Sequence, residues 1–116
     1  MDTTSFLRVF LPSWLFDYFD ATDIKDSPDR IDVYFDEKKI IPSGYESLLI
    51  YSHGFTPYYI VQDFPVRGKE VYLHLRRHKW KVVTTGEVIT GKFDFAHEGT
   101  RLTKEFVAFL KETNRE

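Results

Sequence analysis

The segment from residue 65 to residue 81 restricts the fold most, because apolar and polar side chains alternate along it with the period of a β-strand. It predicts one long strand over residues 70–83. The first half of this strand keeps its apolar residues on one face, and basic residues continue that face after Leu75. We therefore expect the strand to leave the core there. The continuing face would carry Arg77, Lys79 and Lys81, and the other face Tyr72, His74, Arg76, His78 and Trp80.

Patterns on either side of this segment predict further strands joined by turns. Residues 21–37 alternate with a period of two around the turn Asp26-Ser27-Pro28-Asp29, which is typical of a hairpin with one acidic face. Pro65 and Gly68 mark a tight connection into the long strand. Further strands are expected over residues 48–53, 58–64 and 88–90, the last of them after a hairpin turn at residues 84–87.

Helical segments are expected near both ends of the chain. Residues 4–19 repeat apolar side chains at helical spacing with a break at Pro12, and a last helix begins near Thr100 or Thr103. The N-terminal stripe favours packing against a sheet, with a partner-binding helix as the alternative. Together the patterns predict a single α+β domain over residues 1–116, with a mainly antiparallel sheet of hairpins, an N-terminal helical segment and a C-terminal helix.

The composition limits the cellular context and the available chemistry. The chain has no cysteine, which excludes disulfides and thiolate metal sites. Its N-terminus lacks the pattern of a signal peptide, and no apolar run approaches the roughly 20 residues of a membrane span. A cytoplasmic protein with no membrane partner is therefore expected. The net charge of −2 conceals an asymmetry, since residues 1–47 hold ten acids and five bases.

The basic segment predicts a nucleic-acid interface. Residues 65–81 hold six Lys or Arg against one acid, with aromatic rings between them. Cations neutralise phosphates and rings stack on bases, so this mixture suits DNA or RNA. A solvated face or a protected sheet edge is the alternative reading of the same pattern. The candidate contact residues are Arg67, Lys69, Tyr72, Arg76, Arg77, His78, Lys79, Trp80 and Lys81, extended by Arg101 and Lys104 at the last helix.

No motif in the sequence indicates catalysis, a metal or a cofactor. The chain lacks a glycine-rich phosphate loop, a nucleophile elbow and a His-Glu-x-x-His motif. His74 and His78 would share a strand face, but four residues of strand separate them by about 13 Å, too far for one ion. The alternating acids of residues 32–37 lack the glycine and the terminal glutamate of a calcium loop. We expect a non-catalytic protein.

Residues 62–80 resemble the N-terminal region of bacterial insertion-sequence transposases of the DDE type. In the group concerned, a zinc ribbon precedes a helix-turn-helix and the catalytic domain. Asp63, Pro65 and Gly68 match the Asp-x-Pro-x-x-Gly turn of that ribbon, and residues 76–80 match its basic end. The resemblance implies that the chain contacts DNA within a transposition system.

The chain departs from that family at the metal site. Val82 and Thr85 occupy the positions of the ribbon's Cys-x-x-Cys pair, so the zinc site is not carried over and packing would have to replace it. The whole chain is similar to the short N-terminal-region reading frames found beside some of these elements. In those elements a separate downstream frame encodes the transposase core. The alternative function is therefore a protein-interaction module that docks onto a separately encoded catalytic subunit, through the acidic half of the chain and the segment around Trp14.

Overall fold

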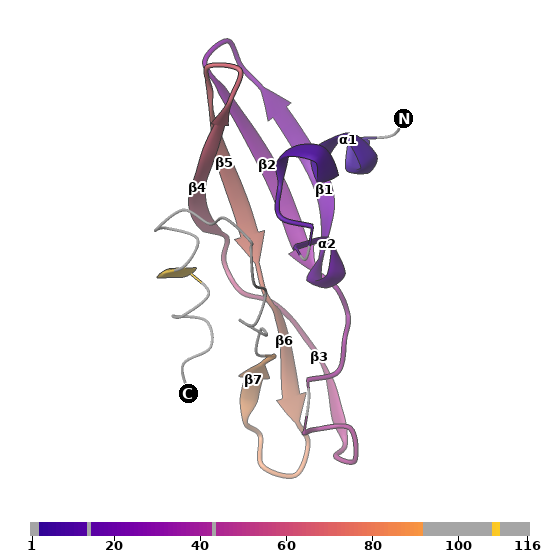
Figure 1. The fold of residues 1–116 in the computed structure, drawn as a ribbon. Coiled ribbons are helices and arrows are strands. Elements are labelled where there is room, and N and C mark those ends of the chain that lie inside the picture. Colours follow the sequence, from indigo (N-terminus) through magenta and orange to yellow (C-terminus); the bar gives the residue numbers. More distant parts are fainter. Residues whose placement is uncertain (1–2, 14, 43, 92–107, 110–116) are drawn as a thin grey trace.

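The computed structural model describes residues 3–13, 15–42, 44–91 and 108–109, and this part of the chain is mainly β (Figure 1). Two short helical segments, α1 (Thr3–Phe10) and α2 (Leu15–Tyr18), precede the strands. The described strands are β1 (Phe19–Asp26), β2 (Arg30–Glu37), β3 (Ile50–Phe55), β4 (Tyr59–Val66), β5 (Lys69–Arg76), β6 (His78–Val82) and β7 (Val88–Thr90).

The strands form two sheets that follow one another along the long axis of the molecule (Figure 1). The first sheet has four strands in the order β1-β2-β5-β4, and the second has three in the order β3-β6-β7. Every pairing is antiparallel except that of β2 with β5, which run parallel. The expected hairpins β1–β2, β4–β5 and β6–β7 are confirmed, whereas the parallel pair makes the first sheet mixed.

Two stretches of chain pass through both sheets. β3 continues into β4 across residues 56–58, and β5 continues into β6 across Arg77 (Figure 1). β4 pairs with β5 in the first sheet, and β3 pairs with β6 in the second. The single strand expected over residues 70–83 is therefore wrong in one respect, because the chain changes sheet at Arg77.

The apolar core lies on one face of the four-stranded sheet. Phe16 and Phe19 meet the ring of Phe35 edge-on, with ring centres 5.9 and 6.5 Å apart. Burying each such side chain stabilises the fold by about 1.5–3 kcal/mol. The alternation expected in β5 is confirmed for its apolar residues, which are buried on this face. The core also includes Leu7, Leu11, Leu15, Val33, Val61, Val71, Leu73, Leu75 and Phe109.

Within the described residues, the helical content is smaller than an α+β class requires. The pattern of residues 4–19 produces helices of eight and four residues, and Phe19, expected at the helix end, opens β1 instead. A β-strand wins there because Phe19 pairs with Glu37 and packs into the sheet core. The helix expected from Thr100 or Thr103 lies outside the described residues, apart from residues 108–109.

Candidate nucleic-acid interface

The parallel pairing of β2 with β5 places the acidic strand against the basic segment. The register sets Asp36 beside Arg76, which donates from Nε and Nη2 to both carboxylate oxygens at 2.6 and 2.9 Å. The guanidinium carbon also lies 4.2 Å from the ring centre of Phe55 and 5.1 Å from that of Tyr58. The hydrogen-bonded carboxylate raises the pKa of Arg76. The charge of Arg76 is thus balanced within the fold.

Arg77 lies inside the molecule where the chain passes between the sheets, and it is 1% exposed. Its Nε and Nη2 donate to the two carboxylate oxygens of Glu37 at 3.1 and 3.0 Å, and Nη2 also donates to the carbonyl oxygen of Gly91. Glu37 accepts a further bond of 2.8 Å from the backbone N–H of His78. The expectation that the strand leaves the core after Leu75 is wrong here. Arg77 links the end of β2 to the residue after β7.

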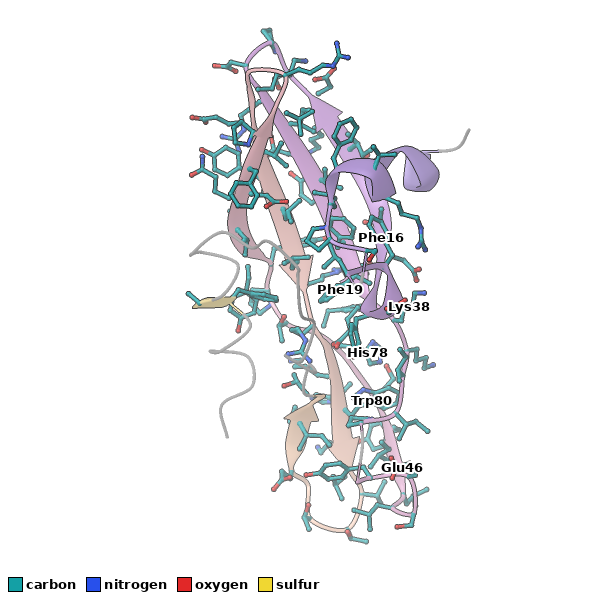
Figure 2. All side chains as sticks on the ribbon, in the orientation of Figure 1. Phe16, Phe19, Lys38, Glu46, His78 and Trp80 are labelled. Carbon is teal, nitrogen blue, oxygen red and sulfur yellow. The ribbon has the colours of Figure 1, made fainter. Side chains whose placement is uncertain are left out.

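His78 and Trp80 are also buried, each 6% exposed, and Figure 2 shows them one after the other along β6. The Nε2 atom of His78 lies 2.8 Å from Oγ of Ser52, and its ring centre lies 4.7 Å from that of Trp80. Burial lowers the pKa of His78, which favours the neutral ring. Both rings fill the interior and offer almost no surface to a base.

The cations near the β4–β5 turn are divided between an ion pair and an exposed position. Nζ of Lys69 lies 2.6 Å from Oδ1 of Asp26. Arg67 is exposed at the turn, with no ion pair to any described residue, and Gly68 beside it has a φ of 79°. Arg67 precedes Lys79 by twelve residues, which corresponds to about 40 Å of strand. These positions therefore lie far apart along the strands and do not form one patch.

A self-paired polar layer covers the second face of the four-stranded sheet. Arg30 donates to both oxygens of Asp32 at 2.9 and 2.6 Å, and Nε2 of His74 lies 2.7 Å from Oδ1 of the same carboxylate. These hydrogen bonds, that from Arg30 first, lower the pKa of Asp32 to about 2. The His74 ring stacks on Tyr34 at 4.2 Å, and Arg30 lies 4.0 Å from the ring centre of Tyr72. The candidate residue Tyr72 is thus one member of an internally neutralised layer.

Lys79 and Lys81 differ from the other cations of β5 and β6, since neither forms an ion pair with any described residue. They alternate along β6 with the buried residues and so occupy the opposite face of the sheet. The register sets Lys81 beside Tyr51 of β3 and Val88 of β7, and Lys79 beside Thr90. Both lysines are half-buried, because their neighbours cover the stems.

Two exposed rings share this face with the lysines. Tyr51 is 47% exposed, and the exposed ring of His53 lies 6.5 Å from it between centres, with the ring planes at 75°. We call these four residues, Tyr51, His53, Lys79 and Lys81, the lysine–tyrosine face. The sequence predicted its lysines but missed its rings. Tyr51 and His53 do alternate in the sequence, but only the β3–β6 pairing brings them beside the lysines.

Arg101 and Lys104 lie outside the described residues. Within the described ranges, no three His, Cys, Asp or Glu residues are grouped to hold a metal ion, and neither helix is long and apolar enough to cross a membrane. A scan of protein-family models and searches of curated proteins and of solved structures find no match to this chain.

Proposed function

We propose that the protein is a non-catalytic DNA-binding component of a transposition system, and that it meets the DNA backbone through Lys79 and Lys81. The observation that carries this proposal is the contrast within the basic segment. Arg76 and Arg77 are neutralised by acids of β2, whereas the two lysines of β6 have no described acidic partner. Lysine is a compact cation that binds phosphates without the fixed geometry of arginine.

The transposition context rests on the resemblance of residues 62–80 to the ribbon-bearing transposases. The buried state of Val82 is compatible with that reading, because this residue stands where the ribbon has a cysteine. In the same sheet Phe55 and Trp80 pack on His78, at the opposite end of β6 from Val82, so packed side chains line β6 from one end to the other. A metal-free ribbon held by packing is therefore part of the proposal.

Two phosphate contacts make a weak, salt-sensitive interaction. Each contact contributes about −0.9 to the slope of log K against log salt for duplex DNA and about −0.7 for a single strand. The lysine–tyrosine face alone would thus give a slope of about −1.8 for duplex DNA or about −1.4 for a single strand. Residues outside the described ranges, Arg101 and Lys104 among the candidates, would add to it if they contact the same strand.

Fluorescence anisotropy with labelled DNA, in duplex and single-stranded form at ~50 mM salt, tests the proposal. The variant Lys79→Ala/Lys81→Ala should lose affinity and flatten the salt slope. Lys25→Ala is the matched control. Lys25 is exposed on β1 and lies over the ring of Tyr34, and both residues belong to the four-stranded sheet, away from Lys79 and Lys81. Absence of binding to either DNA form by the unaltered protein would refute the proposal.

A second candidate function is docking onto a separately encoded catalytic subunit. Exposed apolar side chains gather where β3 begins and β6 ends, since the backbone N–H of Val83 donates to the carbonyl oxygen of Leu49 at 3.0 Å. Leu48 and Val88 are exposed nearby along the chain. Co-purification with such a subunit, lost in Leu49→Asp/Val83→Asp but kept in Lys79→Ala/Lys81→Ala, would favour this function over DNA contact.

A further inference from the structure

We infer that the lysine–tyrosine face binds unpaired nucleotides, as in a single strand or an opened DNA end, in preference to intact duplex. This inference rests on the proposed function and names the form of DNA that the face accepts. Two exposed rings and two cations without described acidic partners support it. The charge of the β6–β7 hairpin tip argues against the alternative, insertion into a duplex groove.

The exposed rings favour bases that are not already stacked. Almost half of the Tyr51 surface is open to solvent, and His53 beside it is exposed too. In a duplex both sides of each interior base are covered by neighbouring bases, so a surface tyrosine gains little from it. An unpaired base has a free face, and stacking it on an aromatic side chain is favourable and tolerant of sequence.

The position of the cations fits the same ligand. Tyr51 and Lys81 are directly opposite on neighbouring strands, and strands lie about 4.8 Å apart. The flexible lysine stem spans the distance from a base on the ring to the phosphate of the same nucleotide. Lys79 precedes Lys81 by two residues in β6, on the side where His53 follows Tyr51 in the antiparallel β3. A second ring and a second cation therefore lie next to the first pair along the sheet.

The alternative, insertion of the β6–β7 hairpin into a major groove, is disfavoured by charge. A two-stranded ribbon fits that groove in size. The tip between the strands, however, consists of residues 83–87, which contain no base and one acid, Glu87. Glu87 is exposed, so insertion would bring a carboxylate towards phosphates. Binding of bases on the lysine–tyrosine face does not require this insertion.

The test compares single-stranded and duplex DNA of the same length and sequence by anisotropy, using Tyr51→Ala and the conservative variant Tyr51→Phe. Loss of one stacked base should weaken single-strand binding by about 5- to 150-fold in Tyr51→Ala. Tyr51→Phe keeps the ring and should stay within about twofold of the unaltered protein. Duplex affinity should change little in either variant. Urea unfolding of both variants checks that the fold is retained.

The outcomes separate the two proposals. If neither DNA form binds, the proposed function fails and the inference falls with it. If duplex binds as tightly as single strands, or if Tyr51→Ala and unaltered protein bind single strands equally, the inference is overturned while DNA binding through the lysines stands. Preference for the single strand, with a selective loss in Tyr51→Ala, supports both.

Discussion

Removing Glu37 should damage the fold more than removing any other single acid of β2, because its partner Arg77 would remain buried without a counter-charge. Glu37 accepts two bonds from the Arg77 guanidinium and one from the backbone of His78. Breaking a buried ion pair by deleting one partner costs about 3–5 kcal/mol. For a domain whose total stability is about 5–15 kcal/mol, Glu37→Ala would therefore remove a large share of that stability.

The assay is equilibrium unfolding in urea, followed by tryptophan fluorescence. With a slope of about 1.5 kcal/mol per molar urea, the expected loss moves the midpoint by about 2–3 M. Asp36→Ala is the matched control. Its pair with Arg76 is more exposed, with 33% of the Arg76 side chain open to solvent, so its loss should cost only about 1 kcal/mol.

A double variant keeps the reasoning testable if Glu37→Ala fails to fold. Replacing a buried pair by apolar residues of similar volume is often nearly neutral, so Glu37→Leu/Arg77→Met should recover much of the stability lost in the single variant. The reasoning is refuted if Glu37→Ala costs no more than Asp36→Ala. It is also refuted if the double variant is less stable than Glu37→Ala.

The remaining predictions concern buried charge, acid stability and the β4–β5 turn. Asp63 is 5% exposed with no described hydrogen-bond partner for Oδ1, and burial raises its pKa. The free energy of unfolding should therefore fall as pH rises above about 4. Asp63→Asn should add about 1 kcal/mol of stability at pH 7 and nothing near pH 3. The pKa of Asp32 is lowered to about 2, so the stability that its carboxylate contributes is present above about pH 4 and is lost as pH falls towards 2. In an acid titration followed by circular dichroism, Asp32→Asn should lack the loss of stability over this pH range. Gly68→Ala should cost about 1–2 kcal/mol in urea unfolding because its φ is 79°, whereas Gly91→Ala, with ordinary backbone and no close contact, should cost less.

Local patterns predicted the hairpins well, because each hairpin depends on a turn and on alternating apolar and polar residues, both of which can be read from neighbouring positions in the sequence. The tight connection at Pro65 and Gly68 is the turn between β4 and β5, and the acidic strand and its partner form β1 and β2 as expected. The patterns could not predict that β2 and β5 pair in parallel across almost forty intervening residues. Such pairing depends on the complete set of strands rather than on any one segment.

The parallel pairing of β2 with β5 also explains why the sequence pattern wrongly placed Arg76 and Arg77 in the candidate interface. The acidic residues of β2 and the basic run at the end of β5 appeared as two separate surfaces. The parallel pairing instead sets Asp36 beside Arg76, and the next residue of each segment, Glu37 and Arg77, forms a second ion pair. A charge count cannot distinguish cations available to a ligand from cations held by the fold. Only the register shows that Arg76 and Arg77 belong to the second class, while Lys79 and Lys81 form no ion pair with the described residues.

The slope of log K against log salt for single-stranded DNA tests this division of the basic segment most directly. We expect Lys79→Ala/Lys81→Ala to flatten the slope by about 1.4, and Arg76→Ala to leave it unchanged because Asp36 already neutralises that arginine. A slope that is unchanged in the double lysine variant and flattened in Arg76→Ala would contradict the account.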